Sequence, residues 1–172
     1  DNSFLRNKEC IKAELQQNYD LYGTTKYVII DDTFNEQTVK LEAIAEAIEE
    51  LNLPVKLQFS SFIRIDLIAA FPEQIDLLKR INVCAWFLGV ESLNYESAKT
   101  IGKGCPKEKV FDTIEKSKEA FGGSLSIYGS FIAGLPHDNR ETMDVWTKEL
   151  FERKDLFDAY SFSPLELGTA SE

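Results

Sequence analysis

Helical and strand patterns alternate along the whole chain. Stretches with apolar residues three and four positions apart predict amphipathic helices, and short continuous apolar runs predict strands that are covered on both faces, as in parallel sheets. Five helices are expected, around the apolar stripes Ile11–Tyr22, Leu41–Leu51, Ile75–Ile81, Val110–Phe121 and Met143–Leu150. Five strands are expected, at residues 28–30, 56–59, 84–88, 125–132 and 158–162.

Residues with special backbone preferences mark where the helices begin and end. Gly23 is expected to end the first helix, because glycine readily adopts the left-handed conformation of a C-cap. Asn35 is expected to cap the second helix, and Leu53-Pro54 to end it. Pro72 is expected at the start of the third helix, where the N–H that proline lacks would have no helical partner.

The spacing of these elements predicts parallel strands. Successive strands begin about 30 to 40 residues apart, the length of one strand and one crossover helix, so neighbouring strands should be parallel with right-handed connections. A closed barrel of eight such units typically needs about 250 residues. The 172 residues therefore predict one α/β domain over residues 1–172, either an open doubly wound sheet or a partial barrel of about five strand-helix units.

Composition narrows the classes of function. The chain is 44% hydrophobic, enough for a real core, and its net charge of -10 argues against binding to a phosphate backbone. No apolar run approaches the roughly 20 residues of a membrane-spanning helix. We therefore expect a cytoplasmic protein that binds neither nucleic acid nor a membrane.

Cysteine and histidine are too sparse to predict a metal site. Cys10, Cys84 and Cys105 lie far apart in the sequence, without the spacing of a zinc site or a disulfide framework. His137 is the only histidine. We expect reduced, structural cysteines and no metal ligands in this chain.

Polar groups follow four of the expected strands. They are Asp31-Asp32-Thr33-Phe34, Arg64 with Asp66, Gly89-Val90-Glu91-Ser92, and Ser130 to Pro136. Because the C-terminal ends of parallel strands share one edge of a sheet, these groups should converge on one rim, where α/β proteins bind ligands. In the last segment, Gly134 and the proline leave backbone groups uncovered, against which a flat ring can lie. Taken singly, each segment is also compatible with a turn, a helix cap or a surface ion pair.

In this order, and together with Lys103-Gly104 and Phe131-Ile132-Ala133-Gly134-Leu135-Pro136, these motifs resemble the core of radical SAM enzymes. The similarity is strongest to the branch whose members often carry a cobalamin-binding domain, in which Asp-Asp-x-Phe and Gly-Val-Glu-Ser are common. The resemblance implies a partial barrel that holds S-adenosylmethionine beside a four-iron four-sulfur cluster and generates a 5′-deoxyadenosyl radical. A bound cobalamin is compatible with it.

The resemblance also implies that part of the catalytic unit lies outside this chain. Family members carry the cluster on a Cys-x-x-x-Cys-x-x-Cys loop after their first strand, and this chain has no such loop. Its opening Phe4-Leu5-Arg6-Asn7-Lys8 resembles the stretch that follows the loop. We therefore expect a fragment of a longer enzyme, open on the side of the missing first strand, that binds no cofactor and is inactive alone. The exposed edge at Tyr27–Ile30 offers a surface for self-association.

The same resemblance implies that each rim residue contacts a different group of S-adenosylmethionine. Asp31 and Asp32, followed by Thr33, would face its ammonium group, and Arg64 its carboxylate. The ribose hydroxyls, or the same carboxylate, would be reached by Glu91 and Ser92. Contacts to the adenine side are expected from Ile132, Gly134, Leu135 and Thr169. No catalytic residue is assigned, and the parent enzyme is expected to need a flavodoxin-like reductant and a small-molecule or peptide substrate.

Two other functions stay open from the residues alone. A flavodoxin-like or other α/β binding domain would use the same rim for a phosphate-bearing ligand. Such a domain would require a glycine-rich turn at the start of a helix, and none follows the first strand. A regulatory domain would bind a divalent cation through Asp31 and Asp32, and it would need a third acidic residue that the spacing does not clearly supply.

Overall fold

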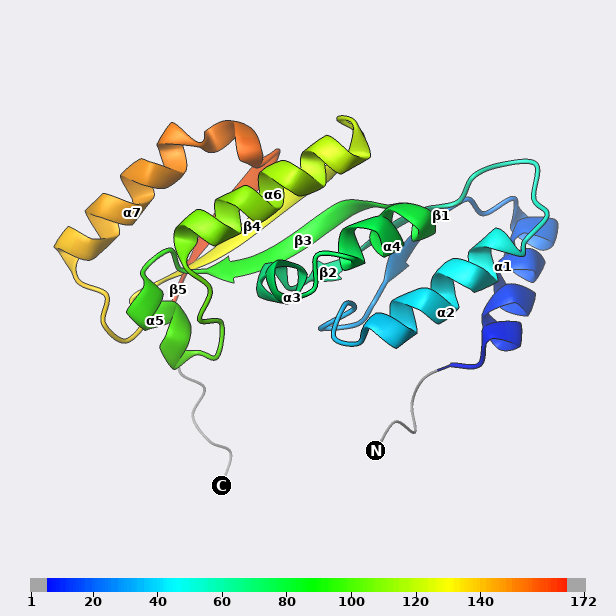
Figure 1. Ribbon diagram of the computed structural model, residues 1–172, viewed down its shortest axis with the longest axis horizontal. Helices are drawn as coiled ribbons and strands as arrows, with labels where there is room; N and C mark the ends of the chain where they lie inside the picture. The colour runs from blue at the N-terminus through cyan, green and yellow to red at the C-terminus, as the bar shows by residue number, and fades with distance from the viewer. Residues whose placement is uncertain (1–5, 167–172) are drawn as a thin grey trace, which may run out of the picture.

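The computed structural model describes residues 6–166, which alternate between strands and helices (Figure 1). The strands are β1 (Lys26–Ile29), β2 (Gln58–Ile63), β3 (Val83–Glu91), β4 (Ser126–Ala133) and β5 (Ala159–Pro164). The helices are α1 (Lys8–Tyr22), α2 (Thr38–Glu49), α3 (Ile65–Ala70), α4 (Gln74–Ile81), α5 (Tyr95–Thr100), α6 (Lys107–Phe121), α7 (Arg140–Glu152) and the short 3-10 helix η1 (Lys154–Leu156).

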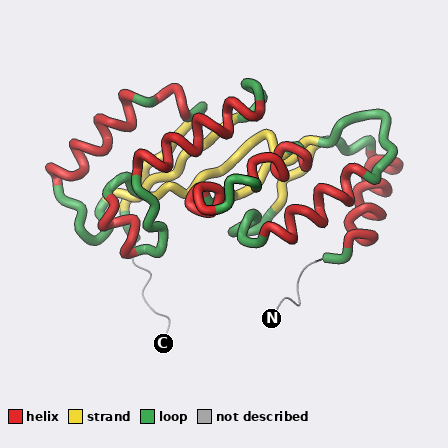
Figure 2. Tube along the Cα trace, viewed as in Figure 1, coloured by secondary structure: helices red, strands yellow, loops and turns green. Residues whose placement is uncertain are grey.

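All five strands are parallel, and their order in the sheet is their order in the sequence, β1-β2-β3-β4-β5. Figure 2 shows the strands as one band with the helices arranged along it. Among the described residues β1 and β5 pair with one neighbour each, so the sheet is open. The predicted fold, a partial barrel of parallel strand-helix units that does not close, is confirmed.

The core lies between one face of the sheet and the helices. Along β2, Phe59, Ser61 and Ile63 are buried while Gln58 and Phe62 are exposed, as expected for a strand with one covered face. Trp86 of β3 packs edge-on against a phenylalanine of α6, with ring centroids 5.7 Å apart. Full burial of an aliphatic or aromatic side chain contributes about 1.5–3 kcal/mol, so this one layer supplies the main drive for folding.

The opposite face of the sheet is uncovered in the part of the chain that the structure describes. Val28 is 63% exposed and Ile30 is 88% exposed. Phe62, Phe87 and Tyr128 form an aromatic row across β2, β3 and β4 on this face, with successive ring centroids 5.4 and 5.8 Å apart. The prediction that the run at 28–30 is covered on both faces is therefore wrong here. Helices on one face alone also exclude a doubly wound sheet, which carries helices on both.

The apolar pattern of the sequence does not predict two short helices, α3 and α5. α3 and α5 have six residues each, which is less than two helical turns and too short to establish a period. The predicted total of five helices is therefore too low. Both short helices directly follow a strand, and they place the next part of the chain at the C-terminal edge of the sheet.

Asn35 does not cap α2. The helix begins at Thr38, and its N-cap is Gln37, which makes no side-chain capping hydrogen bond. Asn35 is instead fully buried, and its partners belong to other elements. At the end of α1, by contrast, Gly23 adopts the expected left-handed conformation, with φ of 63°.

The remaining helix boundaries are displaced by a few residues. α2 ends at Glu49, before the Leu53-Pro54 step that was expected to end it, and α4 begins at Gln74 rather than at Pro72. Within residues 6–166, no helix is both long and apolar enough to cross a membrane.

Candidate functional site

The candidate site is the rim formed where β1 to β4 end. Because the strands are parallel and neighbouring, the segments that follow them all leave the sheet at the same edge. The predicted site residues Asp31, Arg64, Glu91 and Gly134 occupy four successive strand ends. Thr169, the last predicted contact, lies outside the described residues.

At the end of β1, the two aspartates have different surroundings. Asp31 is half-buried, forms an ion pair with Lys40 of α2 and accepts a hydrogen bond from the Thr33 N–H at 3.0 Å. Burial raises the pKa of Asp31, but the hydrogen bonds from Lys40 and Thr33 outweigh it and leave the pKa below its usual value. Asp32 is exposed and forms no ion pair with any residue between 6 and 166. Asp31 thus serves the fold, and Asp32 presents its carboxylate to solvent.

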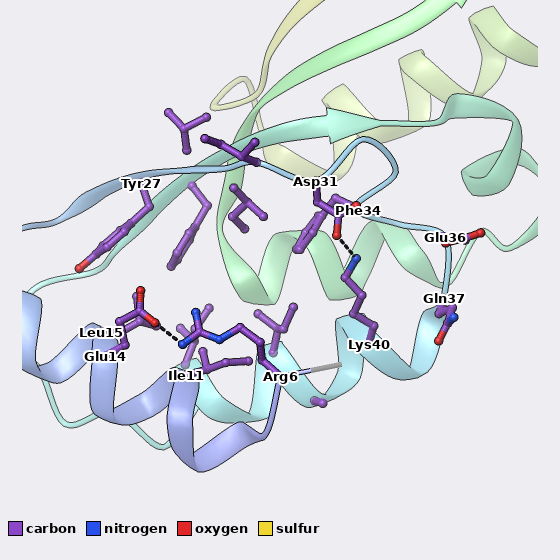
Figure 3. A pocket seen from close by; sticks show the side chains of 17 residues that line it. Arg6, Ile11, Glu14, Leu15, Tyr27, Asp31, Phe34, Glu36, Gln37 and Lys40 are labelled. Carbon is purple, nitrogen blue, oxygen red and sulfur yellow. Dashed lines mark hydrogen bonds and ion pairs between the residues drawn. The ribbon is translucent and has the colours of Figure 1, made fainter. Parts of the chain in front are cut away.

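A cavity of about 640 Å³ lies beside β1, between this strand and helices α1 and α2 (Figure 3). Ile11 and Leu15 of α1, Tyr27 of β1 and Phe34 give it an apolar lining. The Asp31–Lys40 ion pair lies at one side of it, as the dashed line in Figure 3 marks. Charged side chains, among them Arg6, Glu14 and Glu36, complete the lining, so the cavity is of mixed character.

At the end of β2, Arg64 is held in a bidentate ion pair. Its Nε and Nη2 donate to the two carboxylate oxygens of Asp66 at 3.1 and 2.6 Å, and Nη2 also donates to the carbonyl oxygen of Gly102 at 3.1 Å. The hydrogen bond to Asp66 raises the pKa of Arg64, and burial opposes it. The ion pair foreseen as an alternative is therefore present. The hydrogen bond to Gly102 connects the end of β2 to the loop between α5 and α6.

At the end of β3, Glu91 pairs with Lys103, a residue to which sequence reasoning gave no role. Lys103 Nζ donates to Glu91 Oε1 and to the Gly89 carbonyl oxygen, both at 2.8 Å. Glu91 has φ of 66°, and the register of β3 on β4 shifts between Gly89 and Glu91. A Cβ on Gly89 would lie 2.5 Å from Glu91 Oε1, so this ion pair needs a glycine at position 89. Ser92 is buried, and its hydroxyl oxygen accepts a hydrogen bond from the Asn94 N–H at 3.0 Å, in a turn that leads into α5.

At the end of β4, the chain turns sharply. Gly134 has φ of 88°, and a Cβ there would have no atom within 4 Å, so glycine is favoured by backbone conformation while the space beside it is open. Ile132 is half-buried and Leu135 is buried. Asp138, which the sequence did not single out, accepts hydrogen bonds from the Leu135 N–H at 3.0 Å and from the Ser97 hydroxyl at 2.8 Å. This carboxylate fixes the turn against α5.

The described residues contain no group of three or more histidine, cysteine, aspartate or glutamate side chains placed to hold a metal ion. Cys10 is exposed on α1, Cys84 belongs to β3, and Cys105 precedes α6. Burial raises the pKa of the Cys105 thiol, which makes it a poorer ligand. A divalent-cation site at Asp31 is also disfavoured, since Lys40 already neutralises that carboxylate.

Comparison with protein families identifies the superfamily of this chain. The family model described as "Radical SAM superfamily" matches residues 2–150. The chain belongs to the radical SAM superfamily. The resemblance that the strand-end motifs carry is thereby confirmed for the superfamily.

The relatives of this radical SAM chain are longer proteins. An uncharacterised methyltransferase of Pyrococcus horikoshii is 27% identical over 128 residues, which is 74% of this chain and 26% of the relative. Among solved structures, the radical S-adenosylmethionine methyltransferase TsrM from Kitasatospora setae, with cobalamin and a [4Fe-4S] cluster bound, has a TM-score of 0.71 at 16% identity, covering 94% of this chain and 30% of TsrM. Coproporphyrinogen III oxidase from Escherichia coli has a TM-score of 0.64 at 15% identity, covering 93% of this chain and 37% of that enzyme.

A third solved structure, the cobalamin-dependent S-adenosylmethionine radical enzyme OxsB, has a TM-score of 0.67 at 18% identity and covers 95% of this chain and 23% of OxsB. The printed descriptions of two of these three solved structures, TsrM and OxsB, name cobalamin. At these identities the structures show a shared fold, and the chain spans between about a quarter and two fifths of the proteins it matches.

Proposed function

We propose that this chain is the S-adenosylmethionine-binding core of a longer radical SAM enzyme. The observation that carries the proposal is the distribution of charge at the rim of a chain that belongs to this superfamily. An exposed carboxylate, a guanidinium and a second carboxylate follow β1, β2 and β3 in turn, at Asp32, Arg64 and Glu91. S-adenosylmethionine carries an ammonium and a carboxylate at one end and ribose hydroxyls and adenine at the other, so each rim group has a complementary group on the ligand.

The contacts within the rim leave the required atoms available. Asp32 would accept from the ammonium group. Nη1 of Arg64 makes no hydrogen bond to a residue in 6–166, so it would donate to the ligand carboxylate while Nε and Nη2 stay on Asp66. Glu91 bonds Lys103 through Oε1 alone, which leaves Oε2 to accept from ribose hydroxyls. These charge-assisted contacts would orient the cofactor without breaking either ion pair.

The adenine would lie at the end of β4. The open space beside Gly134 gives a flat ring access to backbone groups, and the half-buried Ile132 side chain offers an apolar surface for one face of the ring. Ser92, like Asp31, is a predicted contact to which we assign no bond to the ligand. Because its side chain is buried and its hydroxyl serves the turn before α5, we assign it a structural role and not a ribose contact.

In the longer enzyme, a four-iron four-sulfur cluster beside S-adenosylmethionine would supply the electron for radical chemistry. The described residues do not fit that cluster, because its thiolate ligands must converge on one point and the three cysteines belong to separate parts of the fold. We therefore propose that the cluster ligands belong to a part of the longer protein outside this chain, and that this chain alone is inactive.

The two adjacent aspartates allow a sharp test in the longer, cluster-loaded protein. Asp32→Asn should weaken S-adenosylmethionine binding about tenfold in a calorimetric titration, the loss of one charge-assisted contact, and leave the melting temperature unchanged. Asp31→Asn, the matched control, should lower the melting temperature because Lys40 loses its partner. If Asp32→Asn and Arg64→Gln both bind the cofactor like wild type, the rim is not its binding site.

A further inference from the structure

Two buried amide side chains connect the ends of β1 and β2 behind the rim. Asn35 follows β1 and Gln74 begins α4; they are 39 residues apart in sequence and both fully buried. Asn35 Nδ2 donates to Gln74 Oε1 at 2.9 Å, and Gln74 Nε2 donates to the Asn35 carbonyl oxygen at 3.1 Å. Polar side chains without any exposure occur where their hydrogen bonds specify one arrangement of the surrounding backbone.

The remaining hydrogen bonds of this amide pair hold the backbone of Arg64. Asn35 Oδ1 accepts from the Arg64 N–H at 2.8 Å, and Asn35 Nδ2 also donates to the Arg64 carbonyl oxygen at 3.0 Å. Asn35 therefore forms hydrogen bonds with both backbone groups of Arg64, the residue between β2 and α3. The second Nε2 hydrogen of Gln74 reaches the Thr38 hydroxyl at 3.2 Å, which ties α4 to the first turn of α2. Every side-chain donor hydrogen of the two amides thus has a partner, and each amide oxygen accepts at least one hydrogen bond.

This arrangement connects the backbone segments that carry two rim groups. Asp32 lies three residues before Asn35 in the same short loop, and Arg64 is the residue that Asn35 grips. A further hydrogen bond, from the Phe34 N–H to the Phe62 carbonyl oxygen at 3.3 Å, connects the same loop to the same strand. A loop without regular structure would otherwise let Asp32 move relative to Arg64.

We propose that Asn35 and Gln74 are positioning residues for the amino-acid end of S-adenosylmethionine. They would act by holding Asp32 and Arg64 at the separation that one ammonium and one carboxylate on the same carbon atom require. The inference rests on the proposed function, and it extends the binding site to α4, a helix that contributes no group to the rim.

The test compares two ligands on the longer, cluster-loaded protein. Gln74→Leu removes the hydrogen bonds between residue 74 and Asn35 and leaves Asp32 and Arg64 unchanged. Asn35→Ala removes the side-chain hydrogen bonds to the Arg64 backbone. Both variants should bind S-adenosylmethionine about tenfold more weakly and bind 5′-methylthioadenosine, which lacks the ammonium and the carboxylate, like wild type. Ile114→Ala is the matched control, since Ile114 is equally buried in α6 but makes no polar contact to the rim. It should lower the melting temperature and change the affinity for neither ligand.

A second measurement follows the backbone in this chain without any ligand. Gln74→Leu should speed amide hydrogen exchange at Arg64, whose N–H donates to Asn35, and Ile114→Ala should not do so selectively. Equal losses of affinity for both ligands, or unchanged exchange at Arg64, would overturn the positioning role. If Asp32→Asn and Arg64→Gln bind S-adenosylmethionine like wild type, the proposed function fails; if they weaken binding and Gln74→Leu does not, only the positioning role fails.

Discussion

Replacing one glycine should separate the stability of this chain from its ability to bind the cofactor. A Cβ at position 89 would lie 2.5 Å from Glu91 Oε1 and 2.7 Å from Lys103 Nζ, closer than real contacts allow. Both atoms are the ends of flexible side chains, so Gly89→Ala should move the ion pair and leave the backbone in place. The fold should therefore survive while Glu91 leaves its present position.

The expected change is small for folding and large for binding. Alanine in a strand is more stable than glycine by roughly 0.5–1 kcal/mol, and a partly exposed ion pair contributes about as much, so the free energy of unfolding of Gly89→Ala should change by less than about 1 kcal/mol. Loss of a hydrogen bond that the charged Glu91 carboxylate accepts from the ligand costs about 1.5–3 kcal/mol, which is about a tenfold to 100-fold weaker affinity.

The assay is calorimetric titration of the longer, cluster-loaded protein with S-adenosylmethionine, paired with thermal unfolding. Gly104→Ala is a matched control, because a Cβ there meets its nearest atoms at an ordinary 3.6 Å. Glu91→Gln, which keeps the shape and removes the charge, should reproduce most of the loss in affinity. If Gly89→Ala binds as tightly as Gly104→Ala, the position of Glu91 does not matter for cofactor binding.

Four further outcomes are expected. Because the pKa of Asp31 is lowered in the folded chain, its ion pair stabilises the protein above the pKa of the unfolded state, and this effect is lost as pH falls through the folded pKa. In denaturant titrations, the stability difference between wild type and Asp31→Asn should therefore shrink as pH falls below about 4. A difference that stays constant with pH would contradict this. Gly134→Val should cost at least about 1–2 kcal/mol of stability, since φ of 88° is disfavoured for a branched side chain, and unchanged melting would refute it. Reconstitution of this chain with iron and sulfide should give no stable cluster absorbance, whereas the longer protein should show it; a cluster lost on mutating Cys10, Cys84 or Cys105 would contradict the proposal. Ile30→Lys should reduce any self-association through the β1 edge, measured by sedimentation, and an unchanged association constant would place the contact elsewhere.

The parallel sheet could be predicted because most of its strands contain short apolar runs, and these recur at the length of one strand-helix unit. β2 and β5 also contain serines, and the strand expected at residues 56–59 lies at Gln58–Ile63. The rim could be predicted for the same reason, since strand ends in a parallel sheet share one edge. What local pattern cannot supply is the partner of a polar side chain. Asn35 has the residue type of a helix cap, but its partners are 29 and 39 residues away in sequence. Lys103 and Asp138 likewise act on residues that only the folded chain brings near.

The apolar run at 28–30 shows a second limit of sequence reasoning. Valine and isoleucine occur both in strands covered by helices on two faces and in strands that line the inside of a barrel, because the same residue types suit either surface. The apolar pattern therefore correctly predicted a strand, but the expectation that both of its faces are covered was wrong. Which face stays open depends on where the helices pack, and that is decided by the whole sheet.

The sequential order of the strands has a consequence for how the chain folds. Each strand pairs only with the strands next to it in sequence, so every pairing closes a loop about as long as one strand-helix unit, and the entropic cost of adding a unit stays nearly constant along the chain. A ribosome that releases the chain from its N-terminus thus delivers the units in the order in which they dock, and no strand has to wait for a distant partner. β3 lies at the centre of the sheet, between β2 and β4. Its backbone amides should exchange hydrogen most slowly, and protection from exchange should decrease toward β1 and β5.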